Sequence, residues 1–225
     1  MPLEDQPTSR DVAAWLLEAG CVSARTAEPF RLPSGWASPV YMDCRRLISF
    51  PTIRRAVVAL ALRTLQSAGA LDGVTSIAGA ETSGIALAAW MAHELELPLQ
   101  YVRKKAIGHT LIEGVIKPGD RVLLVDDVMA AGQSKARFLR TLTDAGAIVK
   151  DVFVVFDYGT FNARDALLAR GVRVHALATW QDILAVAGQR RDLPRSGLDE
   201  LTDFLQDTAA WSVAHGGVGI SPAFN

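Results

Sequence analysis

The sequence has few cysteines and no excess of charge. Its 225 residues include two cysteines, Cys21 and Cys44, and neither lies in a C-x-x-C or mixed Cys/His pattern. This argues against a disulfide framework and a structural zinc site, so we expect two packed thiols. Lysine and arginine number 23, aspartate and glutamate 24, and the net charge is -1. With no overall positive field to attract nucleic acid, any anion site has to be local.

Long apolar runs and targeting signals are also missing. No stretch reaches the roughly 18 apolar residues that a membrane-spanning helix requires. The first residues, MPLEDQPTSRDVAAWLLEAG, carry acids early and lack the basic flank and apolar block of a secretory signal. We therefore expect a soluble protein of the cytoplasm that does not act on membranes.

Two common nucleotide-binding motifs are absent as well. The chain contains no G-x-x-x-x-G-K-[ST], the loop that holds nucleoside triphosphates. The segment GAETSG at 79–84 does not fit G-x-G-x-x-G. A phosphate site in this chain must therefore use another arrangement.

Strands and helices alternate along most of the chain. Apolar runs predict strands at 74–80, 98–103, 120–127, 147–158 and 172–180, and helical spacing predicts helices at 10–19, 51–70, 83–95, 132–146 and 162–171. Apolar strands separated by helices indicate an α/β fold, with a parallel sheet covered by helices on both faces.

The regions on either side of this alternation differ from it. Turn residues flanked by aromatic and β-branched residues in 30–47 predict a small β-rich subdomain. We therefore divide the chain into an N-terminal helix and β-rich subdomain (1–50), an α/β core (51–180) and a C-terminal appendage (181–225). The appendage has one predicted helix near 197–210 and the Gly-rich tail HGGVGISPAFN.

The segment VLLVDDVMAAGQS (122–134) ends a buried strand on two carboxylates. In α/β sheets ligands bind at the carboxyl ends of the strands, and successive strand residues point to opposite faces. One carboxylate can therefore accept hydrogen bonds from a ligand diol while the other orders the loop or a metal shell. The next residues begin a helix, whose free N–H groups attract anions. Asp126 and Asp127 followed by Ala130, Ala131, Gly132, Gln133 and Ser134 thus suit a ribose 5-phosphate. The alternative is that the two aspartates only cap the next helix.

Two further segments carry weaker signals. The strand-to-helix turn GAETSG could hold a second anion such as pyrophosphate near Glu81, although a simple turn explains it equally well. The segment 103–119 is predicted to be a loop with Gly108 and Gly114 as hinges. It holds the densest basic patch of the chain, formed by Arg103, Lys104, Lys105 and His109. Such cations can neutralise a departing pyrophosphate, and a mobile loop can exclude water; the alternative is a solvated basic loop.

Together these segments resemble the type I phosphoribosyltransferases, and in particular their orotate-specific members. VLLVDDVMAAGQS resembles the phosphoribosyl-pyrophosphate motif of that superfamily. PFRLPSGWASPVYMDCRRLISFP (29–51) resembles the N-terminal hood of the orotate enzymes, GAETSGI (79–85) their pyrophosphate turn, and YVRKKAIGHTLIEG (101–114) their catalytic loop. The resemblance extends from about Pro29 to Trp180.

The resemblance implies transfer of ribose 5-phosphate from phosphoribosyl pyrophosphate to orotate, with Mg²⁺ held by the substrate diphosphate rather than by protein side chains. It also implies a homodimer whose basic loop reaches the partner's site. Asp126 and Asp127 would hold the ribose, and residues 130–134 the 5′-phosphate. The catalytic contacts to pyrophosphate would come from Arg103, Lys104, Lys105 and His109, and the remaining substrate contacts from Glu81, Thr82, Ser83, Ser34, Tyr41 and Tyr158.

Several positions depart from the family pattern. Ile107 stands where the family has a second loop lysine, Thr110 where it has a glycine, and the loop is shortened. Ala130 replaces a threonine of the phosphate loop. Many members also have lysines at the positions of Pro33 and Ser83, and an arginine near Tyr158. These departures predict impaired catalysis and leave two alternatives open: a binding or regulatory protein on the same fold, and a phosphoribosyltransferase for another base.

Overall fold

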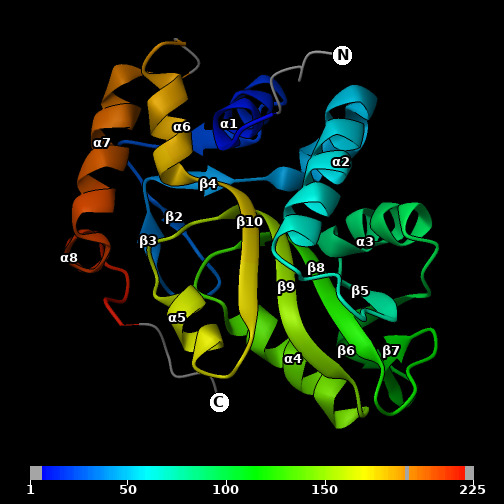
Figure 1. The fold of residues 1–225 in the computed structure, drawn as a ribbon. Helices are drawn as coiled ribbons and strands as arrows, with labels where there is room; N and C mark the ends of the chain where they lie inside the picture. The colour runs from blue at the N-terminus through cyan, green and yellow to red at the C-terminus, as the bar shows by residue number, and fades with distance from the viewer. Residues whose placement is uncertain (1–6, 191–192, 221–225) are drawn as a thin grey trace, which may run out of the picture.

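A six-stranded sheet forms the centre of the molecule (Figure 1). The structure is a computed structural model that describes residues 7–190 and 193–220. The strands are β5 (Ser76–Ala80), β6 (Leu99–Ile107), β7 (Thr110–Glu113), β8 (Arg121–Met129), β9 (Ile148–Asp157) and β10 (Arg173–Thr179). They lie in the order β10-β9-β8-β5-β6-β7, and every neighbouring pair is parallel except β6 and β7. The predicted α/β fold is therefore confirmed.

Helices cover both faces of this sheet, as Figure 1 shows. On one face lie α2 (Pro51–Ser67) and α3 (Ser83–Glu94); on the other lie α4 (Gln133–Asp144) and the short α5 (Ala163–Leu168). The central strands β8 and β9 are buried on both faces because each face packs against its own hydrophobic cluster. Continuous apolar runs such as VFVVF are typical of strands in this position.

The prediction of an open loop after residue 103 is wrong for most of that segment. Strand β6 continues to Ile107, and β7 pairs with it antiparallel, with Ile107 opposite Thr110. The two strands are joined by Gly108 and His109. Gly108 has a φ of +63°, a conformation that glycine adopts without strain. The segment thus forms a tight hairpin, in which Lys104 and Lys105 belong to strand β6.

The N-terminal region is β-rich as predicted, apart from its last residues. After α1 (Ser9–Glu18), strand β1 (Val22–Ala24) pairs with β4 (Val40–Met42), and β2 (Phe30–Arg31) pairs with β3 (Ala37–Ser38). Residues 44–49 form the 3-10 helix η1 (Cys44–Ser49) instead of a strand. Both cysteines are free and buried, which confirms the prediction of packed thiols.

The C-terminal region contains more helix than the sequence pattern indicated. The single helix predicted near 197–210 is two helices, α7 (Arg195–Gln206) and α8 (Thr208–Ala214), and α6 (Trp180–Ala187) was not predicted. A capping box begins α6, in which Asp182 Oδ2 accepts from Thr179 N and Oγ1, both at 2.8 Å. The second Asp182 oxygen accepts from Ser9 Oγ at 2.6 Å, which ties α1 to α6.

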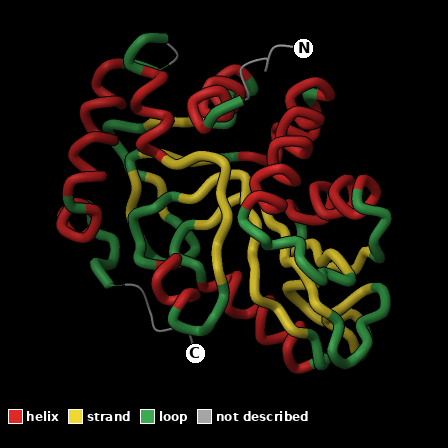
Figure 2. Tube along the Cα trace, viewed as in Figure 1, coloured by secondary structure: helices red, strands yellow, loops and turns green. Residues whose placement is uncertain are grey.

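The two terminal regions therefore meet at one end of the sheet, where Figure 2 shows the helices of α1, α6 and α7 grouped together. Tail residues 221–225 lie outside the described part of the chain. In the described part, no helix combines the length and apolarity needed to cross a bilayer.

Candidate active site

A cavity of about 460 Å³ lies at the carboxyl ends of β5, β8 and β9. The predicted substrate residues that line it are Ser34, Tyr41, Glu81, Ser83, Asp126, Asp127, Ala130, Ala131, Gly132, Gln133, Ser134 and Tyr158, and Lys104 is the predicted catalytic residue that lines it. Residues as far apart in the sequence as Ser34 and Tyr158 thus meet at one edge of the sheet. Thr82, Arg103, Lys105 and His109 do not line the cavity.

Asp126 is held by a buried ion pair. Its Oδ2 lies 2.5 Å from Nζ of Lys135, which also donates to the carbonyl oxygen of Val128. The Lys135 and Asp126 side chains are 4% and 9% exposed, so both charges are largely removed from water and depend on each other. Oδ1 of Asp126 accepts from the backbone N–H of Asp127 at 2.9 Å. Asp126 therefore has a fixed orientation before any ligand binds.

Asp127 has no such cationic partner among the ion pairs of the described residues. Its Oδ1 accepts from the backbone N–H of Val128 at 2.8 Å. Burial and the negative charge of Asp126 raise the pKa of Asp127 from 3.8 to about 7. Within the described chain, the hydrogen-bond partners of the two carboxylates are the backbone N–H groups of Asp127 and Val128 and the Lys135 ammonium, none of them a backbone N–H of α4, so these bonds do not cap the helix. The two aspartates thus do different work: Asp126 is neutralised inside the protein, and Asp127 presents a carboxylate that a ligand can satisfy.

This raised pKa predicts a specific pH dependence of stability. Between about pH 4 and 7, the native state holds a proton on Asp127 that the unfolded chain has released, so the free energy of unfolding falls as pH rises and levels off above pH 7. In Asp127→Asn this contribution is absent. We expect the variant to gain about 1–3 kcal/mol relative to wild type between pH 5 and 8. Urea unfolding of both proteins across that range checks this, and parallel pH profiles would contradict it.

The start of α4 has a geometry that suits an anion. Gly132 has a φ of +78°, which turns the chain sharply between β8 and the helix. Ala136 N donates to Gly132 O at 3.0 Å and closes the first helical turn, so the preceding N–H groups form the open end of the helix. This end carries the positive pole of the helix dipole and faces the cavity through residues 130–134.

The turn between β5 and α3 packs directly against β8. A Cβ on Gly84 would lie 2.3 Å from Val125 O and 2.9 Å from Asp126 Cα, so only glycine fits there. This contact brings Glu81 and Ser83 beside the aspartates. Glu81 Oε2 accepts from the backbone N–H of Lys104 at 2.5 Å, which links the turn to β6.

The other three predicted catalytic residues, Arg103, Lys105 and His109, lie on the β6–β7 hairpin and do not line the cavity. Arg103 forms ion pairs with two carboxylates: its Nε lies 2.8 Å from Glu113 Oε1, and its Nη1 lies 3.7 Å from Glu81 Oε1. Its Nη2 donates to the hydroxyl of Tyr101 at 3.1 Å. Lys105 and His109 are exposed, as is Ile107, whose exposed fraction is 60%. Arg103 is thus neutralised by carboxylates of its own chain, whereas Lys105 and His109 project from the hairpin into solvent.

The N-terminal subdomain covers the other end of the cavity. Ser34 and Tyr41 line it from that subdomain, and Tyr158 lines it from the end of β9. The hydroxyl of Tyr158 accepts from the backbone N–H of Met42 at 3.2 Å, so the sheet and the cover are joined directly beside the site. Burial raises the pKa of Tyr158, which keeps the phenol protonated at neutral pH.

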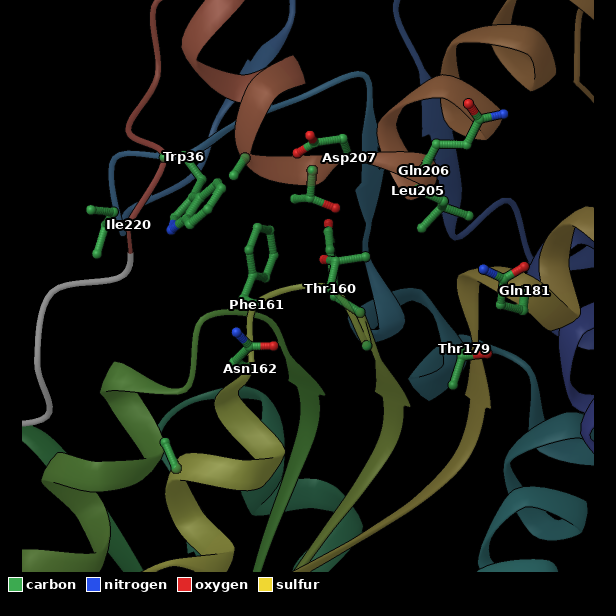
Figure 3. A pocket seen from close by; sticks show the side chains of 16 residues that line it. Trp36, Thr160, Phe161, Asn162, Thr179, Gln181, Leu205, Gln206, Asp207 and Ile220 are labelled. Carbon is green, nitrogen blue, oxygen red and sulfur yellow. The ribbon is translucent and has the colours of Figure 1, made fainter.

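A second cavity, of about 790 Å³, is shown in Figure 3. Trp36 of the N-terminal subdomain, Phe161 after β9 and Asp207 between α7 and α8 face it, together with Ile220 of the tail. Tyr158 lines both cavities. No predicted substrate residue other than Tyr158 lines this second cavity, and none of its lining residues is lysine or arginine. A phosphorylated ligand is therefore better matched by the first cavity.

Three cationic residues of the first cavity were not predicted: Arg45, Lys135 and Arg137. Arg45 forms an exposed ion pair of 2.5 Å with Asp43. For Lys135 a sequence signal exists, because the buried positions Phe138, Leu139 and Leu142 of α4 follow it by three, four and seven residues. Helical periodicity therefore assigns Lys135 to the buried face, where a lysine needs a carboxylate partner.

Known proteins resemble this chain over nearly its whole length. An orotate phosphoribosyltransferase of Sinorhizobium fredii is 42% identical over 212 residues, covering 92% of this chain and 91% of that protein. The crystal structure of orotate phosphoribosyltransferase from Aeropyrum pernix matches with a TM-score of 0.68 and 33% identity, over 79% of this chain and 99% of that one. UMP synthase of Leishmania donovani matches with a TM-score of 0.79 and 28% identity over 89% of this chain, which spans 43% of that protein. No protein-family model matches the sequence. Identity above 40% over nine-tenths of both chains shows that this chain belongs to the orotate phosphoribosyltransferase family.

Proposed function

We propose that the cavity of about 460 Å³ is the active site in which this chain transfers ribose 5-phosphate from phosphoribosyl pyrophosphate to orotate. The products are orotidine 5′-phosphate and pyrophosphate, in the synthesis of pyrimidine nucleotides. The observation that carries the assignment is the convergence of Asp127, the open N-terminus of α4 and Lys104 on one cavity. The carboxylate of Asp127 matches the ribose diol of that substrate, and the N–H groups at the start of α4 match its 5′-phosphate. The ammonium group of Lys104 matches its diphosphate.

The ribose phosphate is held by the β8–α4 segment. Asp127 accepts hydrogen bonds from both ribose hydroxyls. Asp126, already oriented by Lys135, accepts a further hydrogen bond from one of them. Backbone N–H groups of residues 130–134 bind the 5′-phosphate at the positive end of α4. Ala130 contributes its backbone only, since its side chain has no donor.

The diphosphate lies between Lys104 and the turn that carries Glu81, Thr82 and Ser83. As the bond to the ribose breaks, the sugar becomes cationic and the leaving group gains negative charge, which fixed cations stabilise. A Mg²⁺ ion that enters with the diphosphate would supply part of this charge neutralisation. The residues fit this mode of binding, because Mg²⁺ prefers one or two carboxylates together with substrate phosphates and the carboxylates of Glu81 and Asp127 line the cavity.

The pyrimidine is enclosed by the N-terminal subdomain through Ser34 and Tyr41, with Tyr158 beneath it. In this proposal residues 51–180 form the catalytic core, and residues 1–50 together with 181–225 form its cover. We further propose a cytoplasmic location, because both substrates are anions, for which a bilayer is a barrier.

Ile107 limits the rate in this proposal, because it stands on the exposed hairpin where the family pattern has a lysine, beside Lys105 and His109, the two residues proposed to reach the partner's site. Ile107→Lys is expected to raise kcat by about tenfold, equal to about 1.4 kcal/mol of transition-state stabilisation. Leu111→Lys, an exposed apolar position of the same hairpin, is the matched control and is expected to leave kcat unchanged. The measurement is steady-state turnover of orotate, phosphoribosyl pyrophosphate and Mg²⁺, with adenine and uracil as alternative bases.

The wild-type protein in this assay tests the proposed function itself. Turnover of orotate above that of the other bases is expected, at a rate below the enzyme median of about 10 s⁻¹. A rate at that median that Ile107→Lys leaves unchanged contradicts the role of Ile107. Tight substrate binding without turnover would favour a binding or regulatory protein instead.

Lys105 and His109 act in the partner's site in this proposal, since both are exposed and neither lines the cavity of its own chain. In this arrangement each site combines Asp127 of one subunit with Lys105 and His109 of the other. A dimer of Asp127→Asn therefore lacks the ribose carboxylate in both sites, and a dimer of Lys105→Ala/His109→Ala lacks the basic residues in both sites. Subunit exchange between them creates one intact site per mixed dimer, so about a quarter of wild-type activity is expected to return at equal mixing. A monomer by light scattering, or no recovery of activity after exchange, contradicts the shared site.

A further inference from the structure

The turn that covers the pyrimidine end of the site has little structure of its own. Strands β2 and β3 make only two residue pairs, Phe30 with Ser38 and Arg31 with Ala37. Two backbone hydrogen bonds close the turn between them, from Leu32 N to Trp36 O and from Gly35 N to Leu32 O, both 2.9 Å. An isolated two-stranded hairpin is at best marginally stable in water. The orientation of Ser34 at its tip therefore depends on what the hairpin packs against.

The C-terminal segment supplies that support through Ser212. This residue of α8 is fully buried, and its Oγ accepts from the backbone N–H of Ala37 at 3.0 Å and donates to the carbonyl oxygen of Val218 at 2.7 Å. One hydroxyl thus joins three segments: β3, α8 and the tail. Val218 N in turn donates to Gly35 O at 3.1 Å, one residue from Ser34.

Gly217 makes this contact close-packed. A Cβ at this position would lie 2.4 Å from Ala37 N and 2.4 Å from Ser212 Oγ. Both distances are far inside van der Waals contact, and one of the atoms belongs to the backbone, so a larger residue forces the tail away from β3. The turn and the tail also meet at the cavity of about 790 Å³: in Figure 3, Trp36 of the turn and Ile220 of the tail face the same space.

We propose that Ser212 and Gly217 are positioning residues for the nucleobase: through them the C-terminal segment holds the 32–38 turn in the orientation that covers orotate. Neither residue lines the cavity of about 460 Å³, so they act through Gly35 and Ala37. Residues near the C-terminus thereby set the affinity for the base, while phosphoribosyl pyrophosphate is held by β8 and α4, at the other end of the cavity. This inference rests on the proposed function for its substrate, but the contact between tail and turn can be measured separately.

The test compares Gly217→Ala and Ser212→Ala with wild type in two measurements. Hydrogen exchange of the peptide covering residues 30–42 is expected to accelerate in both variants, because the N–H of Ala37 loses its acceptor or its packing. In steady-state kinetics the KM for orotate is expected to rise about tenfold, as for one buried donor left unpaired. The KM for phosphoribosyl pyrophosphate and kcat are expected to change less than about twofold.

Gly188→Ala is the matched control within the same appendage. A Cβ at Gly188 meets only Leu184 O, at an ordinary contact distance of 3.5 Å, and its φ of -61° suits alanine. We expect wild-type exchange and kinetics for this variant. Faster exchange with an unchanged KM for orotate overturns the positioning role, and unchanged exchange in both test variants overturns the contact itself. A wild-type protein that does not use orotate refutes the proposed function and leaves the exchange result to decide whether the tail orders the turn.

Discussion

Lys135→Met is expected to lower the free energy of unfolding by about 3–5 kcal/mol at neutral pH, the cost of leaving one buried charge without its partner. Methionine keeps the length of the side chain but removes the ammonium group that contacts Asp126 Oδ2 and Val128 O. The carboxylate of Asp126 is then desolvated without compensation. Because protonation relieves this cost, the loss is expected to shrink as pH falls toward 4.

The matched control is the double variant Asp126→Asn/Lys135→Met, in which neither charge remains. A buried ion pair replaced by neutral groups of similar volume often leaves stability near that of wild type. We therefore expect the double variant to recover most of the loss, with chemical denaturation as the measurement. Equal instability of the single and double variants would show that Lys135 stabilises α4 by packing alone, and Asp126 would then have another source of compensation.

The sequence located the β8–α4 segment because its signals are local. A buried apolar run, two carboxylates and a Gly-containing turn before an amphipathic helix each restrict the backbone within a few residues. They predicted seven of the eleven residues through which this segment lines the cavity; Val128, Lys135, Arg137 and Phe138 were missed. The alternation of strands and helices predicted the fold class for the same reason. A local signal for α6 is present in the sequence as well: Thr179 followed by Asp182 three residues later is the pattern of a capping box, which marks the start of a helix.

Other features depend on contacts between distant residues and had no local signal. The R-K-K segment gave a loop prediction because glycine and charge are common in loops, yet pairing of Ile107 with Thr110 turns it into a hairpin. Likewise, nothing near Ser212 indicates that it accepts from Ala37, 175 residues earlier. The division of labour between Asp126 and Asp127 also required the structure, because it is decided by Lys135 on the following helix.

That division makes Asp127 the position where stability and function are expected to have opposite requirements. Asp127→Asn removes a carboxylate whose pKa is raised to about 7 by burial and by Asp126, so the unliganded variant is expected to be at least as stable as wild type at pH 8. In the bound state the ribose hydroxyls lose a charged acceptor. Hydrogen bonds to charged groups contribute about 1.5–3 kcal/mol each, and two hydroxyls correspond to a loss of affinity on the order of 10²–10⁴.

Calorimetric titration of orotidine 5′-phosphate at pH 8 measures this loss, and inorganic phosphate is the matched ligand that lacks a ribose. Phosphate affinity is expected to be unchanged, because the N–H groups of residues 130–134 that bind it are untouched. The same titration at pH 6 adds a second criterion, because protonated Asp127 resembles asparagine. The phosphate of the ligand, with a second pKa of about 6, changes the affinity of both proteins, so the quantity compared is their ratio: the affinity of wild type is expected to fall toward that of the variant as pH falls through 7. Equal affinity of variant and wild type for orotidine 5′-phosphate at pH 8 would remove Asp127 from ribose binding. The raised pKa would then belong to a carboxylate that costs stability without a compensating role in the site.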